Sequence, residues 1–198
     1  NSPITIKIHT QSPEIAAGVD KKGAGDQGMM YGFACNESEN FMPLPLTIAH
    51  ELVKKIDEVR ESGEIPFLLP DGKSQVTVVY ENGKPVGVER VVVAVPHEKA
   101  VTIDEVKNAV YGKVITPVLE SHGYSTPIEQ VVLNGTGVWH QPGPAADTGV
   151  TGRKIVVDTY GGMGHVGGGA FSGKDPTKVD RSGAYAARYL AKNIVAAG

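Results

Sequence analysis

The residues best suited to chemistry lie in one glycine-rich, charged segment, residues 151–189. A basic pair, Arg153 and Lys154, precedes six closely spaced glycines, and lysines and an arginine follow with aspartates among them. Glycine lets the backbone approach a ligand and turn its N–H groups toward it. Lysine and arginine supply positive charge for phosphate, and aspartates suit a Mg²⁺ ion that is bound to a phosphate chain. The segment therefore predicts a polyphosphate site with a metal.

Length and charge narrow the possible classes of protein. The 198 residues suffice for one large or two small domains. A net charge of −3 argues against nucleic acid as a partner, which needs a basic face, but a nucleotide needs only a local cluster. No apolar run approaches the length of a membrane span, so we expect no membrane partner. The single cysteine, Cys35, forms no internal disulfide and is either a buried small side chain or a reactive thiol. These features favour a cytoplasmic protein.

The elements that position these residues can be predicted from periodicity. Residues 4–9 alternate as a strand does, residues 11–27 have the composition of a loop, and apolar residues at helical spacing predict a helix over 44–61. Ser62 and Gly63 should end that helix.

The middle of the chain predicts a hairpin followed by a helix. Strands are expected at 74–80 and 86–95, joined by the turn 81–84, whose Asn-Gly pair accepts positive φ. A capping box, Thr102 to Glu105, should open a helix that runs to about Ser121.

The last part of the chain adds two strands and a helix. Strands are expected at 129–133 and 154–158, and a final helix from near Ser182, which Asp180 or Ser182 could cap. The predicted fold class is α+β: repeated strand-strand-helix-strand units with helices packed on one face of mixed or antiparallel sheets.

Four long motifs in a fixed order carry a resemblance to a known family. They are GAGDQG (23–28), PDGKSQV (70–76), DTGVTGRKIVVDTYGG (147–162) and GGGAFSGKDPTKVDRSGAYAARY (167–189). With them, the chain from about Gln11 to Gly198 resembles S-adenosylmethionine synthase, also called methionine adenosyltransferase.

The resemblance implies a transferase of S-adenosylmethionine biosynthesis, within one-carbon metabolism. The methionine sulfur attacks C5′ of ATP and expels triphosphate, which is then hydrolysed to pyrophosphate and phosphate. Mg²⁺ and K⁺ assist as cofactors, and ATP and L-methionine are the substrates. The subunit is a homo-oligomer, a dimer or a dimer of dimers, whose active site lies between two subunits.

The resemblance also implies a division into three similar α+β units. Residues 1–62 would be the end of the N-terminal unit, with a gating loop at 11–21 and the following helix. Residues 63–150 would form the central unit, and residues 151–198 the start of the third unit with its glycine-rich loop. The family's N-terminal His-Pro-Asp-Lys stretch, its glutamates for K⁺ and methionine, and its closing third are not found in these 198 residues.

Two alternatives remain open for the function. One is a catalytically incomplete fragment that binds nucleotide or forms dimer surface without turnover. The other is an unrelated phosphate-binding ATPase, although the sequence contains no GxxxxGK[ST] motif.

By resemblance, the methionine contacts are spread along the chain. Gln11 and Asp26 look like methionine contacts, and Lys178 like a lysine that reaches both methionine and phosphate. Asp147 resembles a carboxylate that touches ATP and the methionine ammonium group. From the residues alone, the gating loop could also be a solvated surface loop, and Asp26 could be a carboxylate in a turn.

The ATP contacts implied by the resemblance fall into two groups. Asp71, Gly72 and Lys73 would line the ATP, although they also read as a plain turn before a strand. Val138 and Trp139 would lie beside the adenine, where an indole can stack, unless Trp139 is a core or interface residue.

The glycine-rich segment would hold the triphosphate. Arg153, Lys154 and Lys174 would contact phosphate, Ala170 would lend backbone contact to the nucleotide, and Asp180 would bind Mg²⁺; a merely charged helix-entry loop is the alternative. Because a thioether is nucleophilic without deprotonation, no activated serine, cysteine or histidine is required. The cations expected to be catalytic, by stabilising the departing triphosphate, are Lys73, Arg153, Lys154 and Lys174.

Overall fold

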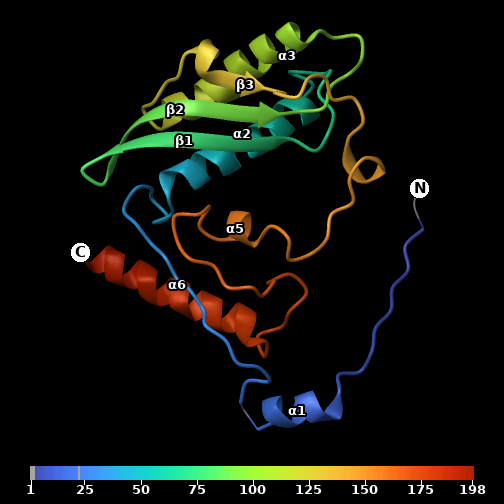
Figure 1. Ribbon diagram of the computed structural model, residues 1–198, viewed down its shortest axis with the longest axis vertical. Helices are drawn as coiled ribbons and strands as arrows, with labels where there is room; N and C mark the ends of the chain where they lie inside the picture. Colours follow the sequence, from blue (N-terminus) through green and yellow to red (C-terminus); the bar gives the residue numbers. More distant parts are fainter. Residues whose placement is uncertain (1–2, 22) are drawn as a thin grey trace.

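The computed structural model describes residues 3–21 and 23–198 and contains one small mixed sheet in these ranges. Its strands are β1 (Lys73–Glu81), β2 (Lys84–Ala94) and β3 (Val131–Leu133), in the order β1-β2-β3. β1 and β2 are antiparallel and β3 is parallel to β2. The predicted α+β class with a mixed sheet is therefore confirmed (Figure 1).

The turn between β1 and β2 has the backbone that its sequence predicts. Asn82 has φ of 51° and Gly83 has φ of 75°. Two consecutive left-handed residues match the right-handed twist of the flanking strands. The hairpin that Asn-Gly predicts is confirmed.

One amphipathic helix, α2 (Leu44–Glu61), packs against the sheet where a helix was predicted. All but one of its buried side chains recur every three to four residues and form one stripe, which consists of Leu44, Ile48, Leu52, Ile56 and Val59; the other is Leu46. The chain leaves the helix after Ser62, and Gly63 takes a φ of 76°, as the sequence indicated.

A second helical run joins β2 to β3 and covers the same face of the sheet. It consists of α3 (Ile103–Val110), the π-helical turn η1 (Tyr111–Ile115) and α4 (Thr116–Ser121). The capping box is present: the Glu105 N–H donates to Thr102 Oγ1, and the Thr102 N–H donates to Glu105 Oε2. Pro117 has no N–H to donate to the preceding turn, which explains the π-helical turn directly before it.

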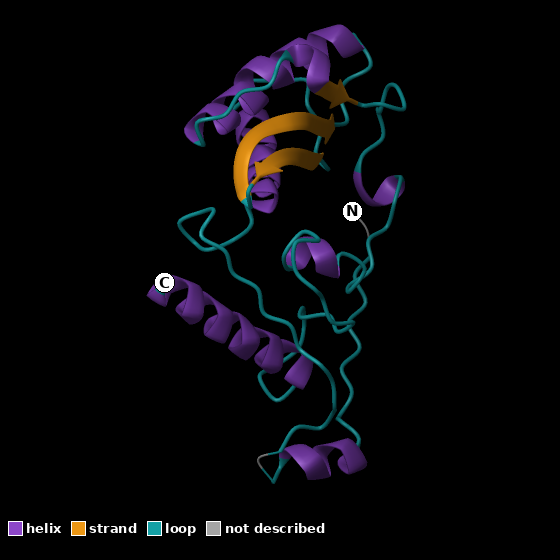
Figure 2. Ribbon diagram, turned by 60° about the vertical axis from the view of Figure 1, so that its left-hand side comes forward, coloured by secondary structure: helices purple, strands orange, loops and turns teal. Residues whose placement is uncertain are grey.

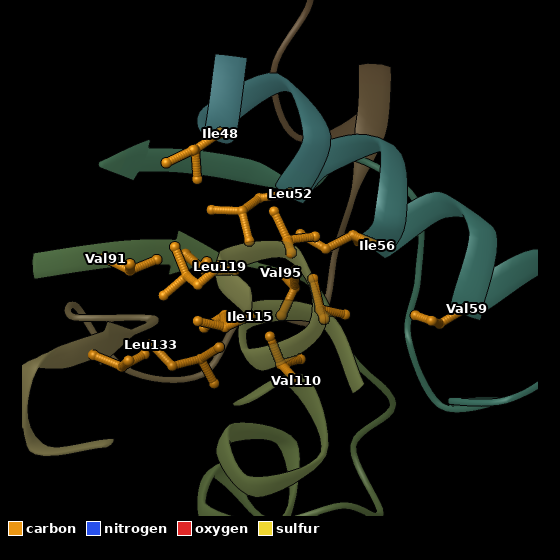
Figure 3. Packing of buried hydrophobic residues seen from close by; sticks show 14 of the residues in the cluster. Ile48, Leu52, Ile56, Val59, Val91, Val95, Val110, Ile115, Leu119 and Leu133 are labelled. Atoms are coloured by element: carbon orange, nitrogen blue, oxygen red, sulfur yellow. The ribbon is translucent and has the colours of Figure 1, made fainter. Parts of the chain in front are cut away.

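The hydrophobic core lies between this face of the sheet and the helices. Figure 3 shows Leu52 and Ile56 of α2, Ile115 and Leu119 of the second helical run, and Val91 of β2 directed toward one another. The other face of β1 is exposed, as its alternating burial shows. Packing of one sheet face against helices fixes the register of the strands.

Two predicted strands are absent from the structure. Residues 4–9 are extended but unpaired, and Ile4, Ile6 and Ile8 are 77–90% exposed. Residues 154–158 form the helical turn α5 (Ile155–Asp158) instead. A strand needs a neighbouring strand for its backbone hydrogen bonds, and neither segment has one within the described residues.

Two other expectations require smaller corrections. The predicted loop 11–27 contains a short helix, α1 (Pro13–Val19), which begins with proline at its first position, a favourable place for that residue. The final helix, α6 (Val179–Ala197), begins earlier than expected, and neither Asp180 nor Ser182 caps it. The Ser182 hydroxyl instead donates to the Lys178 carbonyl.

Helix α6 is attached to the segment 30–41, and the two cross in Figures 1 and 2. The Arg188 guanidinium donates to the Phe33 carbonyl (2.7 Å), the Asn40 carbonyl (2.7 Å) and the Phe41 carbonyl (3.1 Å). These charge-assisted bonds fix the helix, and with it the side chains at its N-terminal end.

The remaining short elements are η2 (Ile128–Gln130) before β3 and η3 (Gly143–Ala145) in the loop that follows it. Within the part of the chain that the structure describes, no helix combines the length and hydrophobicity of a membrane span.

Candidate functional site

An ion pair lies at the N-terminal end of α6. Lys174 Nζ is 2.5 Å from Asp180 Oδ2, and each side chain is less than one-third exposed. The Asp180 carboxylate rests against the backbone of Gly169, where any Cβ would overlap it. The glycine-rich loop therefore approaches Asp180 as closely as it does because residue 169 has no side chain.

A hydrogen bond joins the same end of α6 to a residue near the start of the sequence. The Lys178 ammonium group donates to Gln11 Oε1 at 2.9 Å. Asp26 and the three charged residues Lys174, Lys178 and Asp180 line one cavity of about 230 Å³. We call the five residues Gln11, Asp26, Lys174, Lys178 and Asp180 the charged cleft. Sequence reasoning assigned them to methionine, phosphate or metal, and the structure brings them together.

Hydrogen bonds within the loop before α6 hold it in shape. Asp175 Oδ1 accepts from the Thr177 N–H at 2.8 Å and from the Thr177 hydroxyl at 2.5 Å. These bonds, with smaller contributions from the positive charges of Lys178 and Arg181, lower the pKa of the Asp175 carboxyl. The Asp175 carboxylate therefore stabilises the conformation of the loop.

A second group of predicted residues lies at the start of β1. The Lys73 ammonium group is 5.0 Å from the centre of the Trp139 ring, a cation–π distance. Asp71, with a left-handed φ of 86°, accepts from the Gly143 N–H through Oδ2 at 3.1 Å. We call Asp71, Lys73 and Trp139 the Trp139 group. Gly72 packs on Ile56 in the core, and Val138 beside Trp139 is 63% exposed.

Two histidines that sequence reasoning did not select support the Trp139 group. His97 is fully buried, and its backbone N–H donates to the Trp139 carbonyl at 2.9 Å. Nδ1 of His140 lies 2.9 Å from the His97 carbonyl. The Trp139 indole N–H donates to the Gln141 carbonyl, which fixes the ring. The spacing of the histidines in the sequence does not indicate these contacts. They form only because the loop that carries Trp139 and His140 returns to the end of β2, where His97 lies.

The basic pair stands apart from both groups. Arg153 and Lys154 are exposed, and neither forms an ion pair with a carboxylate among residues 3–21 and 23–198. Ala170 lies against Gly152, the residue before this pair, because a Cβ on Gly152 would lie 3.0 Å from the Ala170 Cβ. Asp147 is exposed, and its backbone N–H bonds to the Gly143 carbonyl. The described contacts therefore bring Gly152 against Ala170 but do not join Arg153 or Lys154 to the charged cleft.

The residues present suit a metal that takes most of its ligands from phosphate. No group of three or more histidine, cysteine, aspartate or glutamate side chains is close enough to hold a metal in the described ranges. Asp180, with Asp26 lining the same cavity, offers one or two carboxylates. That number fits Mg²⁺, which is commonly bound by one or two carboxylates, water and substrate phosphates.

A second cavity, of about 380 Å³, adjoins Asp180 on the side of the glycine-rich loop. Met29, Met30 and Phe171 contribute apolar surface to it. The rings of Tyr31 and His165, which also line it, have centres 5.4 Å apart and planes inclined at 46°. The apolar run directly after GAGDQG was the signal for this wall, and sequence reasoning did not use it.

Comparison with known proteins decides the family. Residues 21–139, more than half of the chain, match the family model described as S-adenosylmethionine synthetase, central domain, and residues 142–198 match the C-terminal domain. This chain belongs to the S-adenosylmethionine synthetase family. The resemblance carried by the four motifs is confirmed.

Two curated relatives show how far the family likeness extends. The chain is 54% identical over 195 residues to S-adenosylmethionine synthase of Sulfurovum sp. (strain NBC37-1), covering 96% of this chain and 50% of that protein. It is 50% identical over 212 aligned residues to the enzyme of the same name from Pseudothermotoga lettingae, covering 98% and 53%. The chain therefore spans about half the length of these S-adenosylmethionine synthases.

Proposed function

We propose that this chain takes part in S-adenosylmethionine synthesis, transferring the adenosyl group of ATP to the sulfur of L-methionine. The observation that carries the proposal is the charged cleft. Residues 11, 26 and 174–180, far apart in the sequence, meet at one end of α6. The chain that carries them is 50–54% identical to curated proteins named S-adenosylmethionine synthase.

The proposed reaction needs positioning and positive charge more than proton transfer. The sulfur lone pair forms a bond to C5′ as the bond from C5′ to the triphosphate oxygen breaks, and the bonding electrons leave with the triphosphate. Triphosphate is then hydrolysed to pyrophosphate and phosphate. Cations preorganised around the leaving group favour the transition state, where negative charge develops.

We assign the triphosphate to the cations of the chain. Lys174 is held at the cleft by Asp180. Arg153 and Lys154 present exposed charges directly after Gly152, which lies against Ala170. Lys73, at the other group, would face the ribose or the phosphates. Mg²⁺, held by Asp180, would add positive charge beside the phosphate oxygens, and K⁺ stays a prediction.

We assign methionine to Gln11, Asp26, Asp147 and Lys178. A carboxylate and an amide oxygen suit an ammonium group, and Lys178 suits a carboxylate. The adenine would lie at Val138 and Trp139, with Asp71 and Gly72 lining the nucleotide.

No hydrogen bond or ion pair among the described residues joins the charged cleft to the Trp139 group. A homo-oligomer would resolve this separation if one subunit supplied the cleft and its partner supplied the Trp139 group. We propose such an interfacial site. The domain limits 1–62, 63–150 and 151–198 and the cytoplasmic location stay predictions.

Incubation of the purified protein with ATP, methionine, Mg²⁺ and K⁺, followed by chromatography, tests the proposal. The sulfonium product is expected, and Arg153→Leu should lower its formation about 100-fold, the loss typical when one electrostatic stabiliser is removed. Lys192→Met, which removes a positive charge from the exposed part of α6, serves as the control. Equal turnover by Arg153→Leu would refute the assignment of Arg153. ATP binding without product would support the alternative of a fragment that binds nucleotide without turnover.

A further inference from the structure

Arg181 belongs to the charged segment but does not face the charged cleft as a free cation. Its Nη1 donates to the carbonyl oxygen of Lys174. Its backbone N–H bonds to the Lys178 carbonyl at 3.1 Å, which anchors residue 181 in the first turn of α6. The guanidinium therefore links the helix to the loop that precedes it.

An aromatic ring also contacts the guanidinium. Arg181 Cζ is 5.5 Å from the centre of the Tyr185 ring, one helical turn further along. The Tyr185 ring in turn packs on the Phe171 ring, with centres 5.7 Å apart and planes inclined at 60°. A planar guanidinium can stack on a ring and still donate from its edge.

These contacts close into a ring around Lys174. The Lys174 N–H donates to the Phe171 carbonyl at 3.3 Å, and the Lys174 carbonyl accepts from Arg181. Arg181 in turn lies over the Tyr185 ring, which packs on the Phe171 ring. The Lys174 ammonium group is held separately by Asp180. Both the backbone and the side chain of Lys174 are thus fixed from adjacent positions of one helical turn.

We infer that Arg181 is a positioning residue, which acts on phosphate through Lys174 rather than by direct contact. The inference rests on the proposed function, in which Lys174 binds the triphosphate. A lysine ammonium group on a flexible stem loses affinity for phosphate if its backbone drifts, and fixing the backbone in advance lowers the cost of ordering on binding. Arg181→Lys would keep the charge but remove the planar guanidinium, which contacts the Tyr185 ring and donates to the Lys174 carbonyl at the same time.

A double-mutant cycle on the purified full chain tests the inference, with inorganic tripolyphosphate and Mg²⁺ as the probe in titration calorimetry. We expect Arg181→Lys to weaken binding about tenfold, the effect of losing one charge-assisted hydrogen bond. In a Lys174→Met background, Arg181→Lys should cause no further loss, because its action passes through Lys174. Lys192→Met, a loss of charge elsewhere on α6, should bind as the wild type does.

Each outcome decides something. Binding by Arg181→Lys equal to the wild type, or losses that add in the double variant, would overturn the positioning role and leave the proposed function intact. If Lys174→Met itself binds tripolyphosphate normally, the proposed phosphate site fails and the inference fails with it. If circular dichroism shows that Arg181→Lys does not fold, the Tyr185→Leu variant tests the positioning role in its place. It removes the stacking partner, and its loss of affinity should likewise vanish without Lys174.

Discussion

Lys174 and Asp180 form an ion pair, in which Nζ lies 2.5 Å from Oδ2. In the proposed function the first of these residues holds phosphate and the second holds Mg²⁺. The carboxylate and a phosphate oxygen would therefore compete for the same ammonium group, and a metal at Asp180 would release that group to the phosphate.

Replacing the carboxylate should change how tripolyphosphate binding depends on metal. Without metal, Asp180→Asn should bind tripolyphosphate about fivefold more tightly than the wild type, since a partly exposed ion pair contributes at most ~1 kcal/mol. Mg²⁺ should then add less affinity in the variant than in the wild type. Calorimetry with and without a chelator measures both, and Asp158→Asn removes the same charge from α5 as a control. Weaker metal-free binding by Asp180→Asn would contradict the competition.

A glycine-to-alanine pair tests the approach of the loop to Asp180. A Cβ on Gly169 would overlap the Asp180 carboxylate, whereas a Cβ on Gly168 would meet no atom within 4 Å. Gly169→Ala should therefore displace the carboxylate and weaken the Mg²⁺ dependence of tripolyphosphate binding, by about tenfold if one ligand contact is lost. Gly168→Ala should show a much smaller change. Similar effects from the two variants would argue against the close approach.

Trp139, the single tryptophan, offers a direct optical test of the adenine assignment. ATP should change its fluorescence and tripolyphosphate should not. Trp139→Leu should weaken ATP binding about tenfold, the cost of one lost base–aromatic stack, and leave tripolyphosphate binding unchanged. Tyr189→Leu, at an exposed ring on α6, is the matched control. An equal loss for both ligands would mean that Trp139 acts on the fold rather than on the base.

The capping box predicts a pH dependence of stability. Hydrogen bonds from the Thr102 hydroxyl and N–H lower the pKa of the Glu105 carboxyl in the folded state. The contribution of Glu105 is therefore fully present above its unfolded pKa and is lost as pH falls through the lower folded pKa. The difference in urea midpoint between wild type and Glu105→Gln should shrink between about pH 6 and about pH 3. A difference that does not vary with pH would contradict this reading.

Local chemistry explains which elements could be predicted. Asn82-Gly83 and the Thr102–Glu105 box encode their structures within four residues, and α2 shows its buried stripe directly in the sequence. The segments 4–9 and 154–158 alternate or run apolar as strands do, but strand formation depends on a neighbour that no local pattern reveals.

The candidate site was predictable in its residue types but not in its contacts. Glycine spacing and charge indicated phosphate, and the family motifs indicated Asp26 and Lys178. The bond between Gln11 and Lys178 spans 167 positions, and Arg181 looked like another phosphate cation until its contact with the Lys174 carbonyl was seen. His97 was missed because its part in supporting Trp139 depends on tertiary structure.

The position of the triphosphate is the most direct test of the central claim. A crystal structure of the protein with a non-hydrolysable ATP analogue and Mg²⁺ should show the triphosphate within hydrogen-bond distance of Lys174, and Arg153 or Lys154 against the same phosphate chain. A triphosphate bound away from all three side chains would contradict the account.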